Sequence, residues 1–358
     1  MNNRLKKSSF NFTTTLLHWH KHVNNRVMPW KGEKDPYKIW LSEIILQQTR
    51  VEQGLAYYNK FIKAYPTIQK LAAAKDEDVF KLWEGLGYYS RCKNILFTAR
   101  EIVSIYNSIF PRNYSDIIQL KGIGKYTAAA ISSFAYNDPY AVLDGNVFRV
   151  LSRVFGIAKP IDSTDGKKFF EELAVDLLDK KEPALYNQAI MDFGATVCTP
   201  KQPNCNTCCF NKYCKAKNEN LIDKFPFKSK KITIQTRWLN YFIFQYQNKV
   251  LIRKRTEKDI WQNLHEFYLI DSSDGEKQDI KNVKTRLKKF LGNEKFKVIS
   301  ISDVQQQKLT HRLIKGNFIK IELKKKIDFE NYFWINKKEM NQYSFPKFIN
   351  HFFETTNY

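Results

Sequence analysis

Apolar residues recur at helical spacing through the first part of the chain, between residues 12 and 215. Segments such as 36–65 and 168–178 carry apolar side chains at intervals of three and four, the pattern of helices with one buried face. Prolines at positions 66, 111, 139 and 160 separate these segments, and no alternation of strands with helices is visible. The pattern predicts a mainly helical domain over residues 1–217.

The pattern changes after Arg237, where short apolar runs rich in β-branched and aromatic residues replace the helical periodicity. A polar helix is expected over 279–291. The segment 218–236, rich in Lys and Asn at its start, is expected to be a linker. We therefore predict a smaller α+β domain over 237–358. Its expected strands cover 239–246, 249–253, 296–301, 318–323 and 332–335.

Charge and composition narrow the class of protein. Lys and Arg number 59 against 36 Asp and Glu, a net charge of +23, which favours a polyanionic partner. No apolar run approaches the roughly 20 residues that span a bilayer, and residues 1–11 lack the apolar stretch of a signal peptide. We expect a cytoplasmic, bacterial protein associated with the nucleoid. In that reducing compartment, six cysteines with five inside 198–214 indicate a metal site rather than disulfides.

The spacing of four cysteines points to the ligands of that metal site. They are Cys198, Cys205, Cys208 and Cys214, separated by six, two and five residues. A zinc ion held by four thiolates is one interpretation. Zinc sites usually combine two Cys-x2–4-Cys pairs, however, and this chain has one such pair. The remaining two cysteines, at 92 and 209, are interpreted as non-ligands.

Two carboxylates stand in positions that suggest chemistry. Glu43 lies in the apolar segment Ile39–Gln48, where burial would raise its pKa to suit a general acid, although a structural ion pair is the alternative. Asp144 precedes Gly145 and Asn146, so that it reads either as a helix N-cap or as a carboxylate that stabilises a developing cation. The glycine-rich turn 120–128 precedes both a tightly packed helix and this aspartate.

These motifs together resemble the helix-hairpin-helix, iron–sulfur base-excision glycosylases, and within them the MutY-type adenine branch. The resemblance spans about 26–353 and is strongest up to Cys214. It implies one [4Fe–4S] cluster on the four cysteines, and double-stranded DNA with adenine opposite 8-oxoguanine or guanine as substrate. It further implies that Glu43 protonates adenine, that Asp144 shields the sugar cation, and that Asn146 or Glu43 delivers water. We expect a monomer.

Tyr126 decides the expected type of reaction. Relatives that also cut the DNA backbone resemble endonuclease III and carry a lysine nucleophile at this place, whereas a phenol cannot form an imine. Lys125 is adjacent, but one helical residue turns it by about 100°. The resemblance therefore implies a monofunctional glycosylase in which Tyr126 bonds to Asp144. The alternatives are a pyrimidine-damage glycosylase-lyase and a non-catalytic iron–sulfur DNA-binding or redox-sensing protein.

The resemblance also assigns DNA contacts. The hairpin turn would bind the backbone, and two residues would insert into the duplex, while others would line the adenine pocket. The backbone contacts are Gly122, Gly124 and Lys125, the inserted residues are Gln48 and Tyr88, and the pocket residues are Arg26, Trp30, Leu46, Gln188 and Met191.

The C-terminal segment resembles the Nudix-like module of the same branch. Residues 259–267 look like a degenerate strand signature of that module, and its metal-binding box is absent from 275–295, so we expect no nucleotide hydrolysis there. The resemblance implies that Leu309, Thr310 and His311 contact the oxidised guanine, with leucine in place of an aromatic residue. A surface turn before a strand is the alternative reading.

Overall fold

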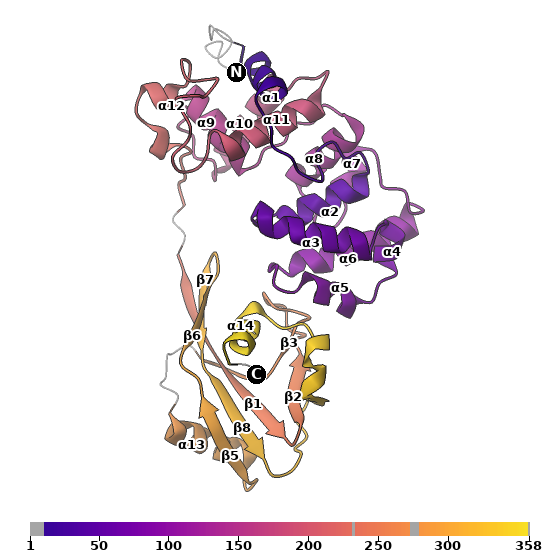
Figure 1. The fold of residues 1–358 in the computed structure, drawn as a ribbon, viewed down its shortest axis with the longest axis vertical. Helices are drawn as coiled ribbons and strands as arrows, with labels where there is room; N and C mark the ends of the chain where they lie inside the picture. Colours follow the sequence, from indigo (N-terminus) through magenta and orange to yellow (C-terminus); the bar gives the residue numbers. More distant parts are fainter. Residues whose placement is uncertain (1–10, 231–232, 273–278, 357–358) are drawn as a thin grey trace. The chain divides into compact units, whose positions relative to one another are not determined.

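The structure is a computed structural model that describes residues 11–230, 233–272 and 279–356. The chain forms two compact units (Figure 1): a helical unit of 1–73 and 94–231, and a C-terminal unit of 74–93 and 232–358. Residues 74–93 therefore group with the C-terminal unit, although the sequence assigns them to the helical domain; the boundaries at 218 and 236 remain a proposal. The described residues include no helix long and apolar enough to cross a membrane.

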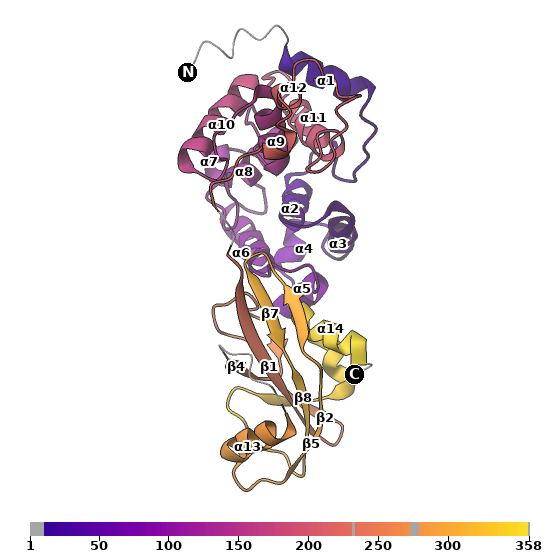
Figure 2. The same cartoon turned by 90° about the vertical axis from the view of Figure 1, so that its left-hand side faces the viewer.

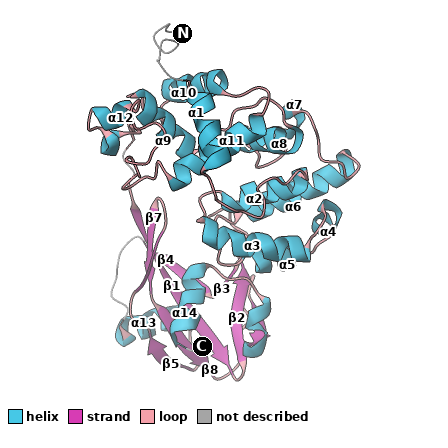
Figure 3. Cartoon of the chain, turned by 45° about the horizontal axis from the view of Figure 1, so that its top comes forward, coloured by secondary structure: helices cyan, strands magenta, loops and turns pink. Residues whose placement is uncertain are grey.

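The helical unit confirms the mainly helical prediction for the first part of the chain (Figure 3). The predicted segment 36–65 is two helices, because the chain turns at 47–50. The helices are α1 (Phe12–His22), α2 (Pro36–Leu46), α3 (Val51–Ala64), α4 (Ile68–Ala72), α6 (Ser90–Ile105, which begins in the other unit), α7 (Tyr114–Ile117), α8 (Lys125–Tyr136), α9 (Gly145–Phe155), α10 (Thr164–Leu177), α11 (Pro183–Thr196) and α12 (Lys215–Asn218), followed by the 3-10 helix η1 (Ile222–Lys224).

Two sets of contacts between helices position the candidate site. Helix α2 is buried around most of its surface and packs against α8, whose small side chains Ala128 and Ala130 are fully buried. Helices α9 and α11 pack together in a second core that includes Phe193 and Phe210. Since α8 contributes to both packings, residues on α2, α8 and the start of α9 can meet although they lie about a hundred positions apart in sequence.

The C-terminal unit is an α+β structure built on one long strand. Strand β1 pairs with β2 and β4 on one side, antiparallel, and with β7 and then β8 on the other, in parallel. Strands β5 and β6 extend the sheet beside β8 and β7, while β3 and β9 pair with β2. The elements are α5 (Asp76–Trp83), β1 (Gln235–Tyr246), β2 (Lys249–Lys254), β3 (His265–Glu266), β4 (Tyr268–Ser272), α13 (Ile280–Leu291), β5 (Phe296–Ile301), β6 (Gln305–Lys308), β7 (Arg312–Gly316), β8 (Phe318–Leu323), β9 (Phe333–Asn336), η2 (Lys337–Gln342) and α14 (Lys347–Thr356).

Two helices cover opposite faces of this sheet (Figure 2). Helix α13 packs on the face that carries Phe242 and Phe244. Helix α14 packs on the other face, where Phe352 stacks on Phe318 at 4.1 Å between ring centres. Successive side chains of β1 point to alternate faces of the sheet. Because a helix covers each face, the centre of β1 is a continuous run of apolar residues.

Candidate active site and metal site

Glu43 lies in the middle of α2 and is 7% exposed, among residues that are almost all apolar. Burial raises the pKa of its carboxyl to about 7; the neighbouring Asp144 also raises that pKa, and a hydrogen bond with Tyr126 lowers it. A carboxyl with a pKa near neutrality is protonated often enough to act as an acid at physiological pH. A raised pKa of this kind is what the predicted general acid would need.

Tyr126 lies beside both carboxylates: besides burial, a hydrogen bond with Glu43 and the charge of Asp144 each raise the pKa of its hydroxyl. Tyr126 stands in the first turn of α8, facing α2, and its own pKa is raised well above the usual range by burial and by the two carboxylates. The phenol thus stays protonated and donates. This arrangement stabilises the ionised form of Glu43.

The structure shows Asp144 as a helix N-cap, one of the two roles that the sequence left open. It is the N-cap of α9 and accepts a hydrogen bond from the backbone N–H of Val147 at 2.8 Å through one carboxylate oxygen. Its other oxygen accepts from the side-chain amide of Asn146 at 2.7 Å. Burial nevertheless raises the pKa of Asp144 above its usual value. The carboxylate is therefore fixed in direction and lies close enough to raise the pKa of Glu43.

Arg149, which the sequence analysis did not single out, ties this carboxylate to the cysteine-rich loop. Its guanidinium donates to the side-chain oxygen of Asn146 at 2.8 Å, to the carbonyl of Gly194 at 2.6 Å and to the carbonyl of Cys198 at 2.7 Å. A Cβ on Gly194 would lie 2.6 Å from that of Asn146, so glycine is needed for this approach. The orientation of Asn146, and through it of Asp144, depends on this arginine.

A buried carboxylate on α11, Asp192, organises the predicted pocket residues. Asp192 is fully buried and accepts from Arg26 at 2.9 Å, from Gln188 at 3.0 Å and from Asn24 at 2.8 Å, and it forms an ion pair with Lys31 at 3.2 Å. Neither Asp192 nor Lys31 was predicted from the sequence. The signal was present, because an acid in an apolar stretch of helix is the same pattern that drew attention to Glu43.

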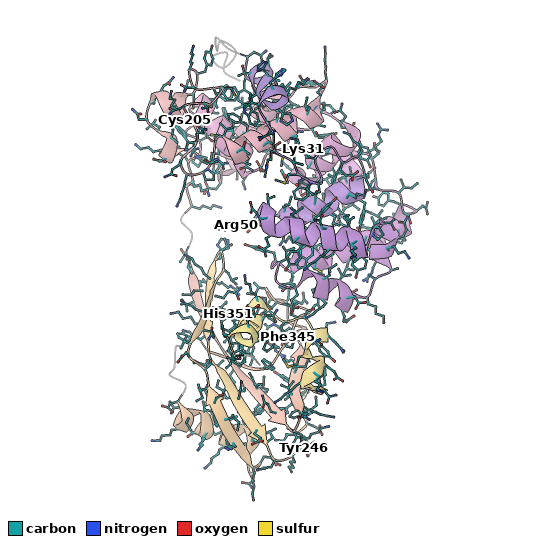
Figure 4. The ribbon with its side chains drawn as sticks, viewed as in Figure 1. Lys31, Arg50, Cys205, Tyr246, Phe345 and His351 are labelled. Carbon is teal, nitrogen blue, oxygen red and sulfur yellow. The ribbon has the colours of Figure 1, made fainter. Side chains whose placement is uncertain are left out.

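Trp30 and Gln188 line one cavity of about 370 Å³, together with Lys31, which Figure 4 labels on the helical unit. Trp30 also packs edge-on against Tyr58 at 5.4 Å between ring centres. The other three predicted pocket residues, Arg26, Leu46 and Met191, do not line this cavity. Met191 packs against the core of α9 and α11, and Leu46 packs beside Gly54 of α3. The structure thus brings together part of the predicted pocket.

The predicted backbone-contact turn is open to solvent. Gly122 has a φ of +82°, and a Cβ there would lie 2.7 Å from the side chain of Asn94, so no other residue fits without strain. Gly124 precedes α8 with open space in front of it. Lys125 is exposed and pairs with Glu171 at 3.0 Å. The amide groups at the start of α8 are therefore accessible to an anion.

Both residues that the resemblance assigns to insertion have a left-handed backbone. Gln48 has a φ of +55° and Tyr88 a φ of +49°, a region that costs a non-glycine residue roughly 1–3 kcal/mol. Gln48 is exposed just beyond α2. Tyr88 is 44% exposed and lies under the guanidinium of Arg91, 5.4 Å from the ring centre. Backbone strain of this kind concentrates where a side chain must be presented to a ligand.

The predicted lesion-contacting residues form the tip of a β-hairpin. Strands β6 and β7 flank Leu309, Thr310 and His311, so the expected loop is a turn between two strands. Within the C-terminal unit, the hydroxyls of Thr310 and Tyr88 lie 2.6 Å apart. Two residues assigned separately to DNA recognition, more than two hundred positions apart in sequence, are therefore in contact.

The four spaced cysteines line one pocket, at the end of the helical unit where Figure 4 labels Cys205. Neither Cys209 nor the buried Cys92 lines it. Arg153 donates toward the sulfur of Cys198 at 3.6 Å, and the backbone N–H of Phe210 toward that of Cys208 at 3.4 Å. The donor set fits a group held by four thiolates, with N–H groups directed at sulfur. No three ligating side chains among the described residues are placed to hold a single metal ion.

Comparisons with known proteins agree with this geometry. Residues 41–174 match the HhH-GPD superfamily of base excision DNA repair proteins, and residues 240–355 match the NUDIX domain. A thermostable thymine-DNA glycosylase of known structure superposes with a TM-score of 0.54 at 30% identity, over 58% of this chain and 95% of its own. The chain is thus a DNA-binding glycosylase of base-excision repair, with a helical domain and a Nudix-like domain.

Two relatives extend the match to most of the chain. The adenine DNA glycosylase of Buchnera aphidicola from Schizaphis graminum is 41% identical over 73% of this chain and 75% of its own length. That of Buchnera aphidicola from Baizongia pistaciae is 36% identical over 89% of this chain and 88% of its own. At this identity and coverage, the chain belongs to the adenine DNA glycosylase family.

Proposed function

We propose that the protein removes adenine from duplex DNA when adenine lies opposite 8-oxoguanine or guanine, and that it does so by hydrolysis without cutting the strand. The observation that carries the proposal is the buried pair of carboxyls, Glu43 with a pKa of about 7 and Asp144 held by its helix N-terminus. Enzymes that break glycosidic bonds need one carboxyl as an acid and a second as an anion. We infer a monomer that acts on nucleoid DNA.

In the first step, Glu43 donates its proton to a ring nitrogen of the flipped adenine. A duplex base must leave the stack before its glycosidic bond can be reached, and Gln48 and Tyr88 fill the space it leaves. Arg26, Trp30 and Gln188 hold the base, with Asp192 fixing the direction of the arginine and the glutamine. Protonated adenine is the better leaving group because it departs neutral.

In the second step, the bond breaks with positive charge developing on the sugar. Asp144 stays ionised and stabilises that charge electrostatically, while Asn146 keeps the carboxylate directed at it. Glu43, now ionised and stabilised by the hydroxyl of Tyr126, accepts a proton from the water that attacks the sugar carbon. Proton donation and proton acceptance thus fall to one residue in turn.

The pH dependence of excision should be bell-shaped. The rate is expected to fall above about pH 7, where Glu43 loses its proton, and to fall at low pH as Asp144 gains one. Tyr126→Phe removes a hydrogen bond that lowers the pKa of Glu43, so the falling limb should move to higher pH. Single-turnover rates at saturating enzyme measure both limbs; a limb that moves to lower pH in Tyr126→Phe would contradict the assignment.

We propose that Cys198, Cys205, Cys208 and Cys214 hold one [4Fe–4S] cluster, since they are the cysteines that line a common pocket. Bound there, the cluster would fix the loop 198–214, which carries lysines suited to DNA phosphates. The loop in turn supplies the carbonyl of Cys198 that orients Arg149.

Serine at a ligand position should remove the cluster. Cys205→Ser purified anaerobically is expected to lose most of the about four irons per chain that a [4Fe–4S] group implies. Cys209→Ser and Cys92→Ser should retain them, because neither sulfur lines the pocket. Iron, sulfide and zinc analyses of all three variants measure this. Stoichiometric zinc without iron in the unsubstituted protein would show that the thiolates hold a different metal.

We propose that the hairpin tip selects the base opposite adenine. Thr310→Ala with His311→Ala should lower the preference for 8-oxoguanine over guanine by about 1–3 kcal/mol, the value of a hydrogen-bonded base contact. The matched control is the double variant Thr355→Ala, His351→Ala on α14, which removes the same two types of exposed side chain elsewhere in the chain. It should keep the full preference for 8-oxoguanine over guanine. Single-turnover rates on the two mispairs, at one salt concentration, measure it. An unchanged preference would place recognition elsewhere.

The proposed substrate is tested by comparing excision from three duplexes of one sequence. Adenine opposite 8-oxoguanine should be removed fastest, adenine opposite guanine more slowly, and adenine opposite thymine not detectably. Release from oxidised pyrimidines in a parallel set, with no release of adenine, would favour the pyrimidine-damage alternative.

A further inference from the structure

One buried arginine near the end of α9 contacts both ends of the cysteine-rich loop. Arg153 is 3% exposed and lines the same pocket as the four spaced cysteines. It lies on the helix that packs against α12, which directly follows the last of these cysteines (Figure 1). Arg149, one turn earlier, is directed at Asn146 and so at the active site, whereas Arg153 is directed at the loop and at the segment after it.

The guanidinium of Arg153 joins two separate segments of backbone. It donates to the carbonyls of Thr199 at 2.7 Å and Pro200 at 3.0 Å, at the start of the loop. It also donates to the carbonyls of Ile222 at 3.2 Å and Phe225 at 3.3 Å, in the segment that follows α12. Arginine alone among the side chains carries five N–H groups in a fixed fork, which is what holding both segments at once requires.

Arg153 also contacts two of the sulfur atoms. An N–H group of its guanidinium is directed at the sulfur of Cys198 at 3.6 Å. Its backbone carbonyl lies 3.4 Å from the sulfur of Cys214. The first and the last of the four spaced cysteines therefore both contact this residue. Positive charge and N–H groups directed at the sulfur ligands of an iron–sulfur cluster raise its reduction potential, because they favour the form with one more electron.

We propose that Arg153 positions the cysteine loop for the cluster and raises the reduction potential of the cluster. The five N–H groups hold the start of the loop and the segment after α12 in place, which slows loss of the cluster. The charge beside Cys198 raises the potential. This inference rests on the [4Fe–4S] cluster proposed above, and it assigns a part in holding that cluster to a residue that is not one of its ligands.

Two substitutions separate the two effects. Arg153→Lys keeps the positive charge, but its donors sit on a single nitrogen, so it loses its hold on the two backbone segments. Arg153→Met keeps an apolar stem and loses both the donors and the charge. The matched control is Arg255→Lys in the C-terminal unit, where the arginine is also 3% exposed and pairs with the buried Glu266.

The full-length proteins are purified anaerobically and supplied with iron and sulfide where their iron content is low. The decay of visible absorption in excess iron chelator gives the rate of cluster loss, and voltammetry gives the reduction potential. Cluster loss should be about 10–100-fold faster in both Arg153 variants, the usual factor by which metal binding weakens when a residue that holds the ligands is removed. The potential should become more negative in Arg153→Met and stay near the unsubstituted value in Arg153→Lys. Arg255→Lys should match the unsubstituted protein in both measurements.

Cluster loss at the unsubstituted rate in Arg153→Lys, or an equal acceleration in Arg255→Lys, would overturn the positioning role. An unchanged potential in Arg153→Met would overturn the electrostatic role, because a residue that only holds the loop would alter retention and not the potential. The proposed cluster survives either result, since the unsubstituted protein would still contain iron. Absence of iron from the unsubstituted protein would contradict the cluster itself, and this inference with it.

Discussion

Replacing Glu43 by glutamine is expected to lower the single-turnover rate of adenine excision by about 10²–10⁴-fold, the value of general acid catalysis. Glutamine has nearly the same shape and can still accept from the hydroxyl of Tyr126, but it cannot give a proton to adenine. Since no positive group is lost, duplex affinity should remain. The rate is measured with enzyme in excess over an A:8-oxoguanine duplex.

The matched control is Glu52→Gln, which removes the same negative charge from the exposed surface of α3. It should excise adenine at the unsubstituted rate. If Glu43→Gln also did so, another group would have to be the acid, and the raised pKa of Glu43 would be a consequence of burial alone.

Two variants of Asp144 should separate its role in capping α9 from its role in chemistry. Asp144→Asn keeps a side-chain oxygen for the backbone N–H of Val147, and asparagine is as good an N-cap as aspartate. Excision should nevertheless fall by about 10²–10³-fold, because the charge that stabilises the sugar cation is gone. Its thermal midpoint should stay near that of the unsubstituted protein.

Asp144→Ala loses both roles, so it should lose excision and also about 1 kcal/mol of stability from the missing cap. Ser163→Ala provides the reverse control, since Ser163 caps α10 by accepting from Gly166 at 3.0 Å. It should lower the thermal midpoint but not the rate. Normal excision by Asp144→Asn would show that Asp144 acts only as a helix cap.

The sequence predicted those parts of the fold that rest on local pattern. The helix expected over 279–291 is α13, which begins one residue later because Asp279 is its N-cap. The five expected strands occur within a few residues of their predicted bounds. Strand β6 was not predicted, because Gln305–Lys308 is wholly polar and its pairing with β7 comes from the hairpin. The grouping of 74–93 with the C-terminal unit likewise depends on contacts that no local pattern encodes.

The candidate site, like the fold, has residues that the sequence could identify and others that it could not. Glu43 could be identified because a lone acid in an apolar helix implies a raised pKa, and Asp144 because an Asp-Gly start is typical of a capped helix. The hydrogen-bond partner of Tyr126 could not be identified from the sequence. Its hydroxyl reaches Glu43 only because α8 packs on α2. Arg149 reads as an ordinary basic residue of an amphipathic helix, and its contacts with Asn146 and Cys198 require the fold.

The central claim is that the protein hydrolyses the bond to adenine and leaves the strand whole. One end-labelled A:8-oxoguanine duplex, incubated with the protein and run on a denaturing gel with and without alkali, tests it directly. We predict an intact strand without alkali and a break at the adenine after alkali. A break without alkali, accompanied by borohydride trapping of the protein on the DNA, or no break under either condition, would contradict the account.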